Sequence, residues 1–225
     1  MKKFIFIAFC LLSAVAATAN DVASFANLGF SNDSRFFLFA ETGQNLEKGQ
    51  IYANGYLVDV VKNQFVRNGI KKAVYEGSVN AGYSDMGALF NLLAEWNHFL
   101  KPYAINHLNT GRLIYSLEPG AEAKNVLSYR DFFTKKNYEI ELNQMKIENP
   151  LKSSFFISVK VTDANGNRLA KVVGRPDFQR ENVSDYFIRQ VIISPDNKQI
   201  VFVIAKTVII DGETSIRYMV ETLSL

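Results

Sequence analysis

The chain has 225 residues, of which 48% are hydrophobic, and carries a formal net charge of +3. A chain of this length can bury one substantial core, and its small net charge lacks the overall basic excess typical of nucleic-acid-binding proteins. The one cysteine, Cys10, lies in an N-terminal apolar stretch. Without that stretch the chain has no disulfide, thiol nucleophile or cysteine metal site.

Residues 1–19 have the pattern of a secretory signal peptide. Lys2 and Lys3 form a charged start, residues 4–15 are apolar or small, and Ala17-Thr18-Ala19 matches an A-x-A cleavage site. The apolar run is shorter than the roughly 20 residues that a spanning helix needs. Removing 19 of the 225 residues, including both lysines, leaves one domain of 206 residues over 20–225 and lowers the net charge from +3 to +1. We therefore expect a secreted protein, most naturally of a bacterial periplasm, with no transmembrane segment after cleavage.

The first part of the mature chain predicts a small antiparallel sheet. Three strands and a short fourth are expected, over residues 24–30, 35–41, 51–61 and 65–66. Apolar residues occupy both faces of the second strand, with Phe36, Leu38 and Ala40 on one face and Phe37 and Phe39 on the other. This strand should therefore be buried between two layers.

One amphipathic helix is expected near residues 84–100. Ser84 and Asp85 can cap its start and Pro102 ends it. Apolar side chains recur at helical spacing, namely Met86, Leu89, Phe90, Leu93, Trp96, Phe99 and Leu100. The helix should pack on a sheet, with Trp96 in the core.

Four more strands are expected after the helix, over residues 112–117, 138–142, 155–162 and 168–173, and residues 174–185 are expected to form a loop. The oxygen-rich run Asp163-Ala164-Asn165-Gly166-Asn167 invites comparison with a calcium loop. Its glycine stands at the fourth place rather than the sixth, and no glutamate follows at the required distance. A hairpin turn is the better interpretation.

The two ends of the mature chain share one pattern, in which a Ser-x-Asp turn separates two apolar strands. It occurs at Ser31-Asn32-Asp33 and again at Ser194-Pro195-Asp196. The match extends further, because Tyr56-Leu57-Val58-Asp59 aligns with Tyr218-Met219-Val220-Glu221 at nearly the same offset. Strands are expected at 186–193, 199–210 and 215–223. Repeated short hairpins of this kind predict related, blade-like sheets at both ends of the chain.

The turn residues themselves have a structural interpretation. Serine bonds back to the chain, Pro195 sets φ, Asn197 accepts the left-handed conformation, and Asp-Gly closes a two-residue hairpin. Asp33 and Asp196 could alternatively be catalytic carboxylates, but the sequence gives no sign that either is buried, as a raised carboxyl pKa would require. The residues assigned to turns are Ser31, Asp33, Ser194, Pro195, Asp196, Asn197, Asp211 and Gly212.

No catalytic, cofactor-binding or metal-binding residue is predicted. His98 and His107 lack the spacing of a zinc motif. The sequence has no nucleophile elbow, phosphate loop or dinucleotide-binding glycine pattern. Paired carboxylates for glycoside hydrolysis would have to come from separate strands, with Glu41, Asp59, Glu139 and Glu141 as the candidates.

Several segments together resemble a known family, the bacterial predicted secreted proteins of domain of unknown function 2259. The segments are the signal sequence, residues 21–25, residues 28–31, the Ser194-Pro195-Asp196 turn and residues 216–220. The resemblance covers most of the mature chain and implies secretion and a shared fold. It brings no established activity, so no site residue is carried over. Asn32 and Ser34 stand where the family usually has Pro and Gly. The Ser-Pro-Asp hairpin is also locally similar to the repeat of TolB-type β-propellers.

The sequence thus predicts a mainly β (α+β) domain, with antiparallel blade-like sheets at both ends and one helix near 84–100. A small or incomplete β-propeller is the alternative. We expect a non-enzymatic binding or envelope-associated module, without a cofactor, whose partner is an envelope protein or glycan. The alternative function is a carboxylate-dependent hydrolase of envelope polysaccharide or peptide. Two carboxylates meeting in a deep pocket would favour the hydrolase, and a concavity lined by aromatics such as Tyr52, Tyr56 and Tyr218 would favour the binding module.

Overall fold

The computed structural model describes residues 21–45, 48–76, 84–118, 120–210 and 212–225. The expected signal peptide and Asp211 lie outside these residues. The described chain is built from three antiparallel sheets and one α-helix, α1 (Met86–Leu100), which is followed by a short 3-10 turn, η1 (Lys101–Tyr103). No helix in this part of the chain is long and apolar enough to cross a membrane.

The helix-side sheet is formed by the N-terminal segment and has the strand order β4-β3-β2-β1-β5. Its strands are β1 (Ser24–Ser31), β2 (Phe36–Asn45), β3 (Gln50–Asp59), β4 (Gln64–Glu76) and β5 (Ile105–Asn106). β4 is much longer than the expected strand at 65–66. It is an edge strand that alternates exposed and half-buried residues, so it lacks the apolar run that marks an interior strand.

The central sheet is formed by the C-terminal segment and has the order β14-β13-β12-β6. Its strands are β6 (Arg112–Ser116), β12 (Val183–Ile193), β13 (Gln199–Ile210) and β14 (Glu213–Ser224). The hairpins β12-β13-β14 correspond in order to β1-β2-β3 of the helix-side sheet. The outer neighbours correspond as well, because β6 pairs with β12 as β5 pairs with β1.

The outer sheet has the order β10-β9-β8-β7, and β11 also pairs with β9. Its strands are β7 (Val126–Asp131), β8 (Lys136–Glu148), β9 (Leu151–Thr162), β10 (Arg168–Gly174) and β11 (Arg180–Glu181). Two expectations are corrected here. β7 was not anticipated at all, and β11 and the start of β12 fall in residues 174–185, which were expected to be loop.

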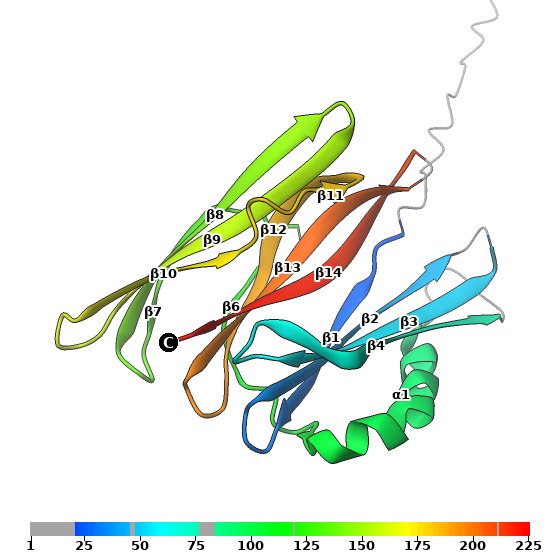
Figure 1. Ribbon diagram of the computed structural model, residues 1–225, viewed down its shortest axis with the longest axis horizontal. Helices are drawn as coiled ribbons and strands as arrows, with labels where there is room; N and C mark the ends of the chain where they lie inside the picture. Colours follow the sequence, from blue (N-terminus) through cyan, green and yellow to red (C-terminus); the bar gives the residue numbers. More distant parts are fainter. Residues whose placement is uncertain (1–20, 46–47, 77–83, 119, 211) are drawn as a thin grey trace, which may run out of the picture.

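The elements stack in four layers, with the central sheet between the other two and α1 on the far face of the helix-side sheet (Figure 1). β13 shows why the central sheet takes this place. Ile200, Phe202 and Ile204 pack toward the outer sheet, whereas Val201 and Val203 pack toward the helix-side sheet, and all five are fully buried. The three sheets of the described chain are fewer than the four blades of the smallest propeller.

The helix-side sheet is also buried on two faces, as β2 was expected to be. Phe37 and Phe39 face the central sheet, and Leu38 and Ala40 face the helix. Trp96 lies in this second core, as predicted.

The helical stripe itself needs one correction. The fully buried positions of α1 include Leu89 and Leu92, whereas Phe90 is 63% exposed. One residue corresponds to about 100° of helix rotation, so Phe90 is turned away from the sheet that Leu89 contacts. Met86, at the first turn, is likewise exposed.

Candidate functional site

A groove of about 670 Å³ lies where all three sheets meet. One wall is formed by β3, β4 and their connecting turn, including Phe65 and Ile70. The floor is edge strand β14 of the central sheet, from Tyr218 to Glu221. The opposite wall is the segment from Arg175 to Arg180, which joins β10 to β11. The size is in the range of small-molecule binding sites.

The floor of the groove is an edge strand whose outward backbone amides are mostly occupied. The Ile216 amide donates to the Asp21 carbonyl at 3.2 Å. The Tyr218 amide donates to Glu41 Oε2 at 2.8 Å, and the Thr222 amide donates to Asn63 Oδ1 at 2.8 Å. Outward amides alternate along a strand, so Val220 presents the one left open between Ile216 and Thr222. This edge is therefore largely protected against the addition of another strand.

Glu41 connects the helix-side sheet to the central sheet beneath the groove. Its carboxylate is 3% exposed and accepts hydrogen bonds from Tyr56 Oη at 2.9 Å, from Asn54 Nδ2 at 3.1 Å and from the Tyr218 amide. Burial, reinforced by the Glu41 charge, raises the pKa of Tyr56 above its ordinary value. Tyr56 therefore remains a hydrogen-bond donor, and both tyrosines are held as walls of the groove.

Five basic side chains surround the groove, namely Lys62, Lys72, Arg175, Arg180 and Lys206. None of them forms an ion pair with another residue of the described chain. Burial lowers the pKa of Lys206; Glu41 opposes that shift, and the charges of Arg180 and Lys72 add to it. A half-buried cation among like charges is an unfavourable arrangement in the absence of an anion.

Arg180 is held in place by aromatic rings. Its guanidinium carbon lies 5.1 Å from the ring centres of both Phe155 and Phe178, and 5.8 Å from that of Tyr186. These are cation–π distances. Nη1 of Arg180 is buried and has no hydrogen-bond partner among the described residues. The guanidinium is thus oriented by stacking, with part of its donor capacity unused.

Glu221 is the one acidic residue among those that line the groove. It is 5% exposed and accepts a hydrogen bond of 2.6 Å from Asn63 Nδ2. Burial raises the pKa of Glu221, and the Asn63 hydrogen bond and the positive charges of Arg180 and Arg175 oppose that shift. Protonation of Glu221 on acidification would make the groove more positive.

The described residues among those expected to form turns do not line this groove. Ser31 Oγ donates to Asp33 Oδ1 and Ser194 Oγ donates to Asp196 Oδ1, both at 2.5 Å. In each turn the aspartate also accepts an amide two residues later, at 3.1 Å, and the serine accepts an amide five residues later, at 2.9 Å. The two turns therefore have the same hydrogen-bond pattern.

The left-handed position of each turn is filled differently. Ser34 has φ of 61° and Asn197 has φ of 59°, although Asn adopts this conformation more readily than Ser. Pro195 occupies the second position of the second turn. Gly212 has φ of 84° between β13 and β14.

The carboxylates considered for hydrolysis do not meet. Glu41 pairs across the ladder with Asn54, five residues from Asp59 on β3, which corresponds to roughly 16 Å along a strand. Asp59 is instead bound by Arg35 at 2.9 Å. Glu139 and Glu141 are exposed on β8 of the outer sheet, which the central sheet separates from the helix-side sheet.

Sequence reasoning did not identify the basic groove. Lys206 was the available signal, because it interrupts the apolar run from Val201 to Ile210. A lysine in a central strand needs a local reason to be there. Arg180 had no comparable signal, since it lies in residues expected to be loop. Tyr56 and Tyr218 do line the groove, whereas Tyr52 instead bonds to Asp21 at 2.9 Å.

The remaining polar features give no metal site. Among the described residues no group of three or more His, Cys, Asp or Glu side chains is placed to hold an ion. His98 is exposed on α1, and His107 Nδ1 lies 2.7 Å from the Leu28 carbonyl oxygen.

Comparison with known proteins identifies one family. A family model described as a predicted secreted protein, domain of unknown function 2259, matches residues 38–224. The match extends from β2 to the end of β14 and contains every residue that lines the groove. No curated protein matches the chain.

Proposed function

Because the chain belongs to this family of predicted secreted proteins, we propose that it is an envelope-associated binding protein that takes an anionic glycan in the groove between its sheets. The signal-peptide pattern of residues 1–19 supports export to a bacterial periplasm. The observation that carries the proposal is the set of five basic side chains around the groove, none of which forms an ion pair within the described chain, beside one acidic residue, Glu221. Lys206 and Arg180 are the most enclosed of these and face the same space.

The aromatic residues of the groove support a saccharide ligand. Phe65 and Phe178 expose about half of their surface on opposite walls, and Tyr56 and Tyr218 lie between them. Ring faces pack against the apolar faces of sugars, while the cations pair with carboxylate or phosphate substituents. An extended peptide is less well suited, because Glu41 and Asn63 already occupy the amides on either side of Val220.

The carboxylate-dependent hydrolase remains the alternative, and it has less support. Glu221 is the one carboxylate at the groove among the described residues, whereas glycoside hydrolysis ordinarily requires a pair. Release of new reducing ends from an anionic glycan by the purified protein would favour this alternative over simple binding.

The binding proposal can be tested by titration calorimetry of the mature chain with oligogalacturonate, a carboxylated glycan. Neutral maltooligosaccharide of the same length is the control ligand. The Lys206→Gln and Arg180→Gln substitutions should each weaken oligogalacturonate binding by about tenfold or more, since a hydrogen bond to a charged group is worth about 1.5–3 kcal/mol. Binding should also weaken as salt rises.

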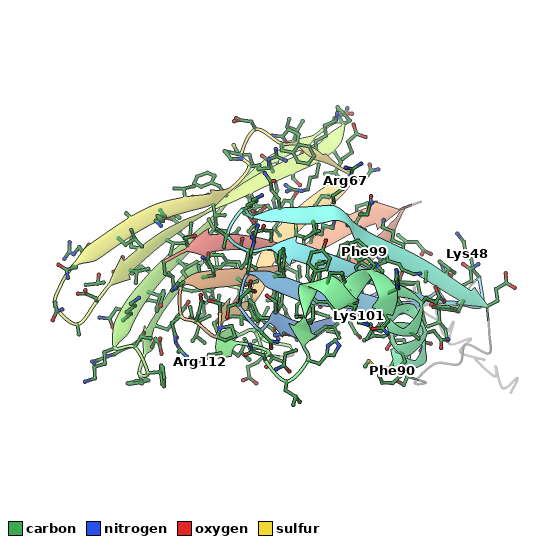
Figure 2. The ribbon with its side chains drawn as sticks, turned by 60° about the horizontal axis from the view of Figure 1, so that its bottom comes forward. Lys48, Arg67, Phe90, Phe99, Lys101 and Arg112 are labelled. Carbon is green, nitrogen blue, oxygen red and sulfur yellow. The ribbon has the colours of Figure 1, made fainter. Side chains whose placement is uncertain are left out.

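Lys101→Gln is the matched control for loss of one positive charge. Lys101 is exposed at the end of α1, as Figure 2 shows, and does not line the groove. This variant should bind as the wild type does. Equal binding of the charged and neutral glycans, or an unchanged affinity in the double variant Lys206→Gln/Arg180→Gln, would contradict the proposal.

A further inference from the structure

The most exposed large apolar side chains of the described chain come from two neighbouring loops. Leu108 is 94% exposed, Phe132 84% and Phe133 75%, and no other large apolar residue of the described chain exceeds 63%. Phe132 and Phe133 form the tip of the β7–β8 hairpin, and Leu108 lies between β5 and β6. Leu108 and Phe133 border the same surface depression, together with Pro195. We call these three side chains, Leu108, Phe132 and Phe133, the apolar tip.

The apolar tip is presented by an ordered turn. Asp131 is buried, and its carboxylate accepts hydrogen bonds from the Phe133 amide at 3.0 Å and from Thr134 Oγ1. Arg112 Nη1 binds the same carboxylate at 2.5 Å, and Arg112 Nη2 binds Asn197 Oδ1 at 3.0 Å. Arg112 thus fastens the hairpin to the turn between β12 and β13. The phenyl rings are held outward by a defined scaffold.

Basic residues flank the apolar tip. The guanidinium carbons of Arg130 and Arg112 lie 5.9 and 4.9 Å from the ring centres of Phe132 and Phe133. Lys135 and Lys136 follow directly in the chain, and Lys135 is exposed. The charge of Asp131 is matched by Arg112. Arg130 and the two lysines therefore give this end of the molecule an excess of positive charge.

We propose that the apolar tip docks this protein on an anionic lipid membrane, with the phenyl rings in the interface and the basic residues against lipid headgroups. Protruding aromatic and aliphatic side chains beside lysine and arginine are the combination that stabilises interfacial membrane binding. A stable protein partner usually buries about 800 Å² on each side. Three side chains on two loops present less than this, whereas a bilayer needs no complementary surface. This inference is independent of the glycan proposal.

The test is sedimentation of the mature chain with vesicles of phosphatidylcholine alone or mixed with phosphatidylglycerol. We expect binding to the mixed vesicles and much weaker binding to phosphatidylcholine. The double variant Phe132→Ser/Phe133→Ser should lower the partition coefficient by about tenfold or more, because affinity follows the buried apolar area. Lys135→Gln and Lys136→Gln should each lower it by about fivefold, the fold-change that corresponds to about 1 kcal/mol per basic residue.

Phe90→Ser is the matched control. Phe90 is exposed on α1 and lies well apart from Arg112, as Figure 2 shows, and Arg112 is the residue that contacts Phe133 of the apolar tip. Replacing Phe90 removes an exposed phenyl ring that is not part of the apolar tip, so vesicle binding should stay unchanged.

Phe132→Trp gives a second, independent measurement that does not require a loss of binding. The native Trp96 is buried, so a blue shift of emission and quenching by brominated lipid would report insertion of the new side chain. Absence of vesicle binding, or binding that survives both the phenylalanine and the lysine substitutions, would overturn the proposal. So would self-association or capture of a protein partner that requires the phenylalanines while vesicles do not bind.

Discussion

Replacement of Glu41 should loosen the attachment of the helix-side sheet to the central sheet. Its buried carboxylate accepts three hydrogen bonds, from Tyr56, Asn54 and the Tyr218 amide. In Glu41→Ala these donors lose their acceptor, and each buried donor left without a partner costs about 1–3 kcal/mol. Some of this is offset because no carboxylate must then be desolvated. We expect a net loss of about 3–5 kcal/mol, the lower part of the summed cost of three unsatisfied buried donors.

Glu41→Gln should be milder, at about 1–3 kcal/mol. The amide keeps one acceptor oxygen for Tyr56 and Asn54, but it turns an NH₂ group toward the Tyr218 amide, which is also a donor. Both values can be measured by urea unfolding followed through the fluorescence of Trp96. Exposed Glu139→Ala is the control and should stay within about 0.5 kcal/mol of the wild type.

A double-mutant cycle with Tyr56→Phe separates the hydrogen bond from other effects. Residues in direct contact have coupling energies of about 0.5–3 kcal/mol, and the coupling of Glu41 to Tyr56 should lie in that range. A Glu41→Ala variant as stable as Glu139→Ala, or additive effects of Glu41→Ala and Tyr56→Phe, would refute the reasoning.

Three further changes test other parts of the structure. Gly55→Ala should lower stability by about 1–3 kcal/mol in a thermal melt, because an added Cβ would lie 2.6 Å from Trp96 Cζ3; an unchanged Tm would contradict the close helix packing. Glu221→Gln should be more stable than wild type at neutral pH. The pKa of Glu221 is raised in the folded protein, so its protonated form stabilises the wild type. This stabilisation is complete below the unfolded pKa of 4.5 and is lost as pH rises through the folded pKa. In urea unfolding the gap between the two proteins should therefore narrow toward pH 4, by about 1.4 kcal/mol for each unit by which the pKa is raised, and a gap independent of pH would oppose this assignment. Asn197→Ala should lower stability by about 1–2 kcal/mol in the same assay, because Asn197 has φ of 59° and its side-chain oxygen accepts a hydrogen bond from Arg112. Asn197→Gly should lose less stability, and equal losses for the two variants would argue against backbone strain at this position.

Local patterns predicted the central strands and the helix well. β13 was expected over residues 199–210 and occupies the same residues, because its apolar run is bounded by clear turn signals on both sides. The burial of β2 on both faces was predicted because consecutive apolar residues place apolar side chains on both sides of a strand. Phe90 was assigned to the wrong face of α1 because a helix with eight large apolar residues has more than one possible stripe, and only the partner sheet selects between them.

The edges of the sheets were harder to predict. β7 carries mainly polar residues on one side, and the second half of β4 mixes charged and apolar residues on both sides, so neither segment shows a clear strand pattern. The groove could not be predicted at all, since it joins residues near 60, 178 and 220 whose proximity depends on how three sheets stack. The apolar tip was hidden for a related reason. Two consecutive phenylalanines, Phe132 and Phe133, are typical of a buried strand, so nothing in the sequence indicated that they lie on the surface.

The stacking order has a consequence for how the protein is made. The layer between the other two is formed mostly by residues 183–224, so the segments synthesised first have apolar faces that only the last segment covers. Before that segment emerges, the outer sheet has no second sheet to pack against, and the helix-side sheet has only α1 on its far face. Folding then depends on contacts distant in sequence, which slows it. Completion of the fold therefore waits for the C-terminal strands, which suits transport in an extended form, and chains that end before residue 183 would leave these apolar faces open to proteolysis.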